Sequence, residues 1–100
     1  METNSAIRER DDINLNEPKR YRVVLHNDDF TTMEFVVLIL TTIFGKSEDE
    51  ANEVMMHVHQ KGNATAGIYT YDIAKSKANK ATKQARENGF PLKLTVESEE

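Results

Sequence analysis

The apolar residues of this chain fall into short runs whose spacing predicts six elements of secondary structure. Runs rich in β-branched and aromatic residues, bounded by turn-forming residues, indicate strands. Runs with apolar residues at i, i+3, i+4 and i+7, such as the one that begins at Ala51, indicate helices. The expected strands are residues 21–26, 66–71 and 92–96, and the expected helices are residues 31–44, 47–61 and 72–88.

The expected helices carry signals at their ends. Thr31 with Glu34, and Ser47 with Glu50, have the spacing of capping boxes, which predicts that each threonine or serine begins a helix. A glycine follows each helical pattern, as is typical of a residue just past a helix end: Gly45, Gly62 and Gly89.

The helical patterns also predict what each helix buries. Residues 35–40 (FVVLIL) are apolar on nearly every side, so we expect the first helix to be buried. The third helix has a face of small residues that allows close packing: Ala74, Ala78, Ala81 and Ala85. The order β-α-α-β-α-β with short connections predicts an α+β fold of two layers, in which a three-stranded antiparallel sheet packs against three helices.

Composition divides the chain of 100 residues into three parts. Residues 1–20 contain only five of the apolar residues and many charges, so we expect a flexible extension there. Residues 21–96 form the expected folded domain, and residues 97–100 an acidic tail. There is no cysteine, no charged signal-peptide opening and no apolar run long enough to span a bilayer. These features predict a cytoplasmic protein that does not enter the membrane.

Several function classes lack their sequence signals. The chain has neither a phosphate-binding P-loop nor a dinucleotide fingerprint, and no nucleophile elbow. The basic outer face of residues 72–88 is more typical of solvated surface than of a nucleic-acid site, because residues 21–70 are acidic. His57 and His59 point about 200° apart on a helix, so they cannot chelate one ion. We therefore expect no catalytic residues, metal, cofactor or nucleic acid.

The sequence Asn27-Asp28-Asp29 allows two interpretations. It can be a turn that caps the following helix. Alternatively, Asn27 and Asp28 can supply acceptors, together with His59, around a pocket walled by apolar residues of the first two helices (Met33, Val36, Met55 and Val58). Such a pocket would suit a ligand with a cation beside a large apolar group, for example a peptide N-terminus.

Four segments make the chain resemble one family closely. They are residues 21–36 (YRVVLHNDDFTTMEFV), 55–62 (MMHVHQKG), 66–70 (AGIYT) and 85–92 (ARENGFPL). In this order they resemble ClpS, the family of adaptors of Clp AAA+ proteases that recognise destabilising N-terminal residues, called N-degrons. The resemblance covers residues 20–96.

The resemblance implies a role for individual residues. The free α-amine of the N-degron would be held by Asn27, Asp28 and His59. The first side chain (Leu, Phe, Tyr or Trp) would enter a pocket made by Thr31, Met33, Val36, Met55, Val58 and Leu92. Met33 would exclude β-branched first residues. Asp72 and Lys77 match the surface that faces the unfoldase, of the ClpA or ClpC type, and the extension matches the arm that assists delivery. We expect a monomer.

The chain departs from the family pattern at Thr32, where proline is frequent, and His57 has no role that the resemblance assigns. Two other classes of function fit the sequence less well. An acid–base enzyme built on Asp28 and Asp29 would lack a nucleophile and an oxyanion site. A pure interaction module, similar in shape to small domains of the ribosomal stalk, would not need the rim of Asn27, Asp28 and His59.

Overall fold

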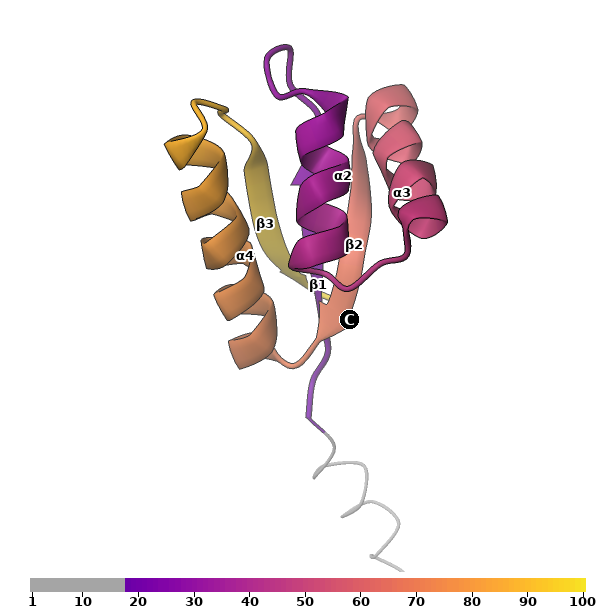
Figure 1. The fold of residues 1–100 in the computed structure, drawn as a ribbon. Helices are drawn as coiled ribbons and strands as arrows, with labels where there is room; N and C mark the ends of the chain where they lie inside the picture. Colours follow the sequence, from indigo (N-terminus) through magenta and orange to yellow (C-terminus); the bar gives the residue numbers. More distant parts are fainter. Residues whose placement is uncertain (1–17) are drawn as a thin grey trace, which may run out of the picture.

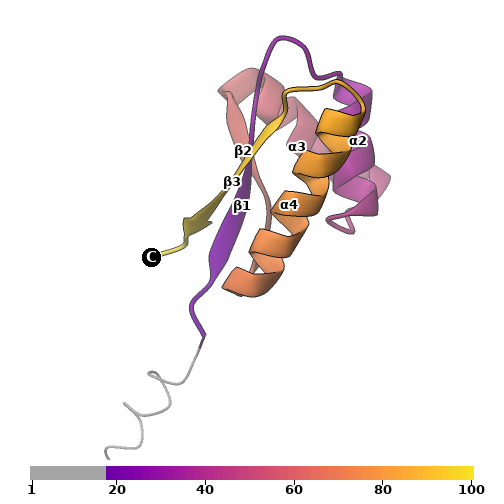
Figure 2. The same cartoon turned by 90° about the vertical axis from the view of Figure 1, so that its left-hand side faces the viewer.

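The computed structural model describes residues 18–100, which form one sheet covered on one face by three helices (Figures 1 and 2). The elements are β1 (Tyr21–His26), α2 (Met33–Thr42), α3 (Glu48–Lys61), β2 (Asn63–Tyr69), α4 (Tyr71–Glu87) and β3 (Lys93–Ser98). The strand order is β2-β1-β3, and both neighbours pair antiparallel to β1. The predicted α+β fold and its element order are confirmed.

The core lies between the central strand and the helices. Val23 and Leu25 of β1 are fully buried and face the helical layer. The predicted alanine face of α4 is confirmed, since its four alanines are at most 5% exposed. Small side chains let this helix lie close to the sheet, which it contacts along β1, β2 and β3.

One expectation about burial is wrong. Phe35, Val36, Ile39 and Leu40 are buried, but Leu38 is 50% exposed. Helix α2 lies over the sheet with α3 and α4 on either side (Figure 1), so its outward face has no covering layer. A helix that is apolar on all sides therefore stays exposed on the side that no further layer of the domain covers.

The starts of the first two helices were predicted with one error. Ser47 and Glu50 form the expected capping box of α3. Helix α2, however, begins one residue later than expected, because Thr32 is its cap and accepts a hydrogen bond from the Phe35 N–H at 3.1 Å. Thr31 instead donates its hydroxyl hydrogen to Asp28. The α2 helix also ends at Thr42 rather than Phe44.

The second strand begins three residues before its predicted start and ends two residues before its predicted end. Asn63 pairs with His26 and continues the register of the β1–β2 ladder, although Asn and Ala have low strand propensity. Tyr71, expected in the strand, is the first residue of α4 and packs edge-on against Tyr21. Pairing with β1 thus overrides the local preferences of this segment.

The ends of the folded domain also differ from the predicted boundaries. Strand β3 runs to Ser98, and Glu97 forms an ion pair with Arg22 at 3.5 Å, so half of the expected acidic tail belongs to the sheet. The Glu99 N–H donates to the Arg20 carbonyl at 3.0 Å. The expected flexible extension, apart from its last three residues, lies outside the described residues.

Candidate functional site

A cavity of about 280 Å³ opens where β1 ends, beside the start of α2 and the end of α3. Its size is near the lower end of the range for ligand pockets, about 300–1,000 Å³, which suits one side chain rather than a large molecule. The cavity is lined by nine residues: Asn27, Asp28, Asp29, Thr31, Met33, Val36, Met55, Val58 and His59.

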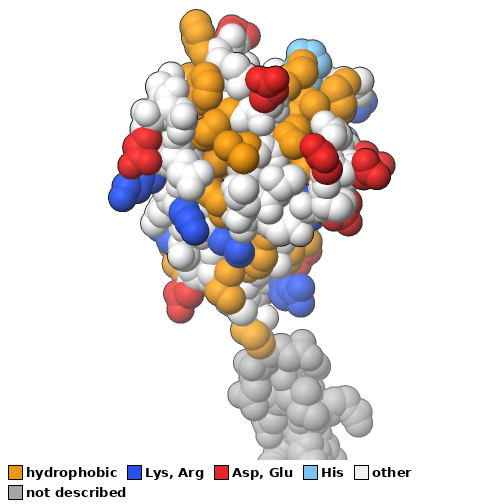
Figure 3. Space-filling view, viewed as in Figure 1, with side chains coloured by type: hydrophobic (Ala, Val, Ile, Leu, Met, Phe, Trp, Pro, Cys, Tyr) orange, Lys and Arg blue, Asp and Glu red, His pale blue; other side chains and the backbone are white. Residues whose placement is uncertain are grey.

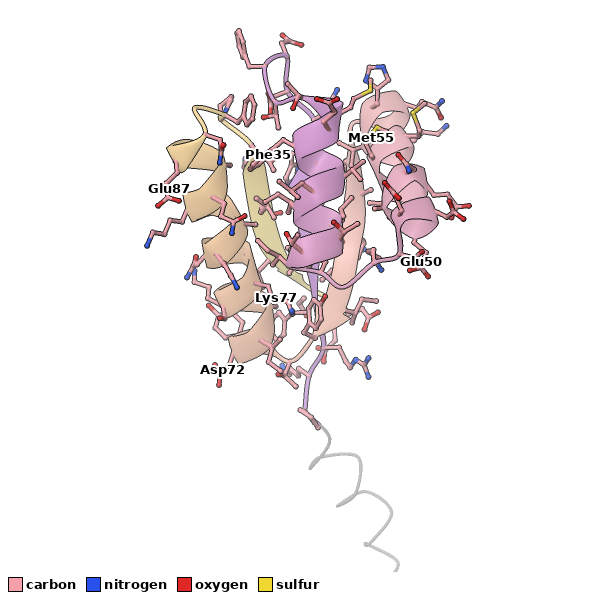
Figure 4. The ribbon with its side chains drawn as sticks, viewed as in Figure 1. Phe35, Glu50, Met55, Asp72, Lys77 and Glu87 are labelled. Carbon is pink, nitrogen blue, oxygen red and sulfur yellow. The ribbon has the colours of Figure 1, made fainter. Side chains whose placement is uncertain are left out.

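The apolar lining comes from facing positions on α2 and α3. Val36 and Val58 are 6% and 3% exposed and form the buried part of the wall. Met33 is 45% exposed, in the first turn of α2. Met55 is half-buried on α3 and lies on the side of that helix near α2 (Figure 4). The two flexible methionines therefore border the cavity, while the two stiff valines shape its interior.

Asp28 is fixed by the loop that it helps to form. Its Oδ1 accepts hydrogen bonds from the N–H groups of Phe30 at 2.8 Å and Thr31 at 2.7 Å. Its Oδ2 accepts one from the Thr31 hydroxyl at 2.8 Å. A carboxylate has about four acceptor positions, so one on Oδ2 is left for a ligand. The turn and binding interpretations of this residue are therefore compatible.

These hydrogen bonds also set the charge of Asp28. Burial is the largest single influence and raises the pKa. The two backbone N–H groups, the Thr31 hydroxyl and the positive charge of Arg86 together outweigh it, so the pKa of Asp28 lies below its ordinary value of 3.8. The side chain is consequently an anion at neutral pH.

Asn27 and His59 are brought to the same rim from two elements. The Asn27 N–H donates to the Gly62 carbonyl at 2.8 Å, which ties the loop after β1 to the end of α3. Gly62 adopts a φ of 94°, a conformation that lets the chain turn from α3 into β2. His59, in the last turn of α3, thereby lines the cavity beside Asn27. His57 points elsewhere, and its Nδ1 lies 3.1 Å from the Asn63 carbonyl oxygen.

Eight of the nine residues predicted for the amine and side-chain sites lie together in this cavity. Leu92 does not line it but is 1% exposed in the core, where Arg86 donates to the Leu92 carbonyl at 2.9 Å. Asp29 also lines the cavity, although it was not assigned to the site. Its position directly after Asn27 and Asp28 is the sequence feature from which its place in the cavity could have been predicted.

The two residues predicted to face a partner lie at the other end of the helical layer (Figure 4). Asp72 is exposed in the first turn of α4. Lys77 is half-buried, because its Nζ donates to the Ile43 carbonyl at 2.8 Å and lies 5.4 Å from the centre of the Tyr69 ring. Lys77 thus connects α4 to the end of α2.

The arrangement offers groups of two kinds that can bind a ligand. Amide, carboxylate and imidazole groups can hold a cation, and the apolar wall can hold a hydrophobic group. Within residues 18–100, no three metal-binding side chains lie close enough to hold an ion. Among the same residues, no helix is long and apolar enough to cross a bilayer.

Comparisons with known proteins agree with this architecture. Residues 16–95 match the model of the family described as ATP-dependent Clp protease adaptor protein ClpS. The chain is similar to the Clp protease adapter protein ClpS of Desulforapulum autotrophicum, with 55% identity over 82% of this chain and 79% of that protein. It is similar to that of Acetivibrio thermocellus, with 43% identity over 99% of this chain and 100% of that protein.

A solved structure shows the same fold. It is Agrobacterium tumefaciens ClpS2 bound to L-phenylalaninamide, with a TM-score of 0.80 and 46% sequence identity. The match covers 83% of this chain and 100% of that chain. The chain therefore belongs to the ClpS family of non-catalytic adaptor proteins of the ATP-dependent Clp protease.

Proposed function

We propose that this protein binds substrate proteins that begin with Leu, Phe, Tyr or Trp and delivers them to a Clp AAA+ unfoldase of the ClpA or ClpC type. The observation that carries the proposal is the unused acceptor position of Asp28 at the rim of an apolar cavity sized for one side chain. The ligand of the Agrobacterium tumefaciens protein, L-phenylalaninamide, combines an amine with an aromatic side chain and supports the same interpretation.

The α-ammonium group of the substrate is the part that distinguishes a chain terminus from an internal residue. In the proposed complex it donates to Asp28 Oδ2, to the Asn27 side-chain oxygen and to an unprotonated ring nitrogen of His59. Because Asp28 is already ordered by three internal donors, binding does not have to order it.

The side chain of the first residue enters between Val36 and Val58. Met33, at the start of α2, would restrict branching at the substrate Cβ and thereby exclude Ile and Val. Thr31 contributes through its contact with Asp28, and Leu92 contributes from the core, where it is buried.

The energies are consistent with an adaptor that must release its cargo. A hydrogen bond to a charged group contributes about 1.5–3 kcal/mol. Burial of a Leu or Phe side chain contributes about 1.5–3 kcal/mol. Two or three such bonds, less the cost of ordering the peptide, correspond to a dissociation constant of about 1 μM or somewhat lower.

The second part of the proposed function is the delivery of the bound substrate to the unfoldase. The surface around Asp72 and Lys77 contacts the unfoldase at the end of α4 that lies away from the cavity, so a monomer can hold substrate and unfoldase together. The extension at residues 1–20 assists the transfer. Removal of residues 1–18 is expected to spare peptide binding and to reduce degradation by the protease, and a loss of peptide binding would instead place the extension in the fold.

The test is fluorescence anisotropy with peptides that differ only in residue one. We expect tight binding of peptides that begin with Leu, Phe, Tyr and Trp, and a loss of at least a hundredfold when the same peptides carry an acetylated amine. Acetylation removes the cation and leaves the sequence unchanged. Equal affinity for free and acetylated peptides would refute the proposed function.

A further inference from the structure

A second and larger hollow lies between α2 and α3, with a volume of about 730 Å³. The family assignment and the cavity described above give it no role. It shares Met33 and Met55 with the small cavity, so the two hollows adjoin at these side chains. Val37 and Leu38 extend its lining along α2. On the helical face in Figure 3, apolar side chains gather with acidic side chains among them.

Two apolar side chains of this groove are largely exposed to solvent. Leu38 is 50% exposed and Met33 45%. Among residues 18–100 no segment covers them. A continuous exposed apolar surface that is bordered by polar groups is typical of a binding site.

The polar border of the groove has an excess of negative charge. Glu34 from the first turn of α2 and Glu48 from the first turn of α3 both line it, against the single ammonium group of Lys46. A basic side chain lying along the groove would therefore meet a favourable field, and an acidic side chain an unfavourable one.

The shared border of the two hollows indicates which ligand can reach the groove. A substrate whose amine is held at Asn27, Asp28 and His59, and whose first side chain fills the cavity, leads its main chain out past the cavity border. Met33 and Met55 form part of that border and are also part of the groove. The next residues of the same chain are thus tethered beside the groove at a high effective concentration.

We infer that the α2–α3 groove binds the residues that follow the N-terminal residue of the substrate, with a preference for an apolar residue followed by Lys or Arg. This inference rests on the proposed function, because the first residue must occupy the cavity. The groove does not alter the choice of the first residue. It adds a second level of selection among substrates that share the same first residue.

The decisive variant is Leu38→Asn, because Leu38 lines the groove but not the small cavity. Two ligands separate the sites: L-phenylalaninamide, which reaches only the cavity, and a labelled peptide beginning Phe-Leu-Lys, which reaches both. We expect Leu38→Asn to weaken the peptide about three- to tenfold and to leave L-phenylalaninamide, measured by competition, within twofold. Ile73→Asn is the matched control, since Ile73 is a helical residue of nearly the same exposure, 49% against 50%.

Charge provides a second measurement. Glu48→Lys is expected to reverse the preference between peptides beginning Phe-Leu-Lys and Phe-Leu-Glu at low salt. If Leu38→Asn weakens both ligands equally, or neither, the groove does not bind the following residues and the inference is wrong. If L-phenylalaninamide fails to bind the unaltered protein, the proposed function itself fails, and the groove inference fails with it.

Discussion

The two ends of the helical layer use their charged groups in different ways. At the cavity end, Asp28 accepts three hydrogen bonds from its own loop and still has an open acceptor position. At the opposite end, the ammonium of Lys77 donates to the Ile43 carbonyl and lies against the Tyr69 ring, while Asp72 is exposed. A carboxylate that its own loop holds in place, and that still has a free acceptor position, is suited to bind a ligand in a specific pocket. A group that ties two helices together has a structural role before any partner arrives.

The largest expected effect concerns the free acceptor position and the negative charge of Asp28. The variant Asp28→Asn keeps an acceptor oxygen for the N–H groups of Phe30 and Thr31, but it removes the negative charge. We expect the affinity for a peptide beginning with Leu to fall about ten- to a hundredfold, since a hydrogen bond to a charged group contributes about 1.5–3 kcal/mol. Fluorescence anisotropy measures the affinity, and circular dichroism checks that the fold is retained.

Asp29→Asn is the matched control for this variant. Asp29 lines the same cavity and removing its carboxylate changes the net charge by the same amount. We expect less than a threefold change, because an exposed charge is screened by solvent and salt. A larger loss in Asp29→Asn than in Asp28→Asn would move the amine site to Asp29 and contradict the assignment.

The next effect concerns the border of the cavity. Met33→Ala removes a flexible side chain at the start of α2 and should make room for branching at the substrate Cβ. We expect peptides that begin with Ile and Val to bind within about tenfold of those that begin with Leu. Met56→Ala is a suitable control, because Met56 is 40% exposed on α3 and does not line the cavity. Continued rejection of Ile and Val by Met33→Ala would show that another residue excludes them.

A smaller effect distinguishes the two residues at the far end. Lys77→Met keeps the aliphatic part of the side chain but loses the hydrogen bond to Ile43, so we expect unfolding by urea to show a loss of about 1–2 kcal/mol. Asp72→Asn should change stability by less than about 0.5 kcal/mol, since Asp72 is exposed in the first turn of a helix. Both variants should weaken binding to the Clp unfoldase and leave peptide binding unchanged. An unchanged stability of Lys77→Met would mean that its contact with Ile43 contributes nothing.

The same contrast between the ends explains what the sequence could predict. Each side of the cavity consists of residues close together in sequence or on one helix face, namely Asn27-Asp28 on one side and Met55, Val58 and His59 on the other. A turn pattern and the helical repeat predicted each side, and the expected packing of the first two helices joined them. The contact of Lys77 with Ile43 joins residues 34 positions apart and depends on how α4 packs beside α2. No local pattern contains that information.

The errors have equally specific causes. Thr31 and Thr32 both have a hydroxyl suited to capping, and the loop hydrogen bond of Thr31 to Asp28 decided which of them begins α2. Asn63 belongs to β2 because β1 offers it a partner, not because of its own propensity.

The smallest expected effect is on stability in acid, and it tests whether Asp28 is held by its loop. Because the pKa of Asp28 is lowered in the folded protein, its ionisation stabilises the fold at pH values above its unfolded pKa. That contribution is lost as the pH falls through the lower pKa of the folded state, where the protonated carboxyl no longer offers the same acceptors. We expect Asp28→Asn to be less stable than the unaltered protein at pH 7, and the difference to shrink steadily as the pH falls below about 4. Urea unfolding at several pH values measures this difference. A difference that stays constant down to pH 2 would show that the hydrogen bonds from Phe30 and Thr31 do not depend on the charge of Asp28, and the loop would then hold the side chain equally well without preparing it as an anion for the substrate amine.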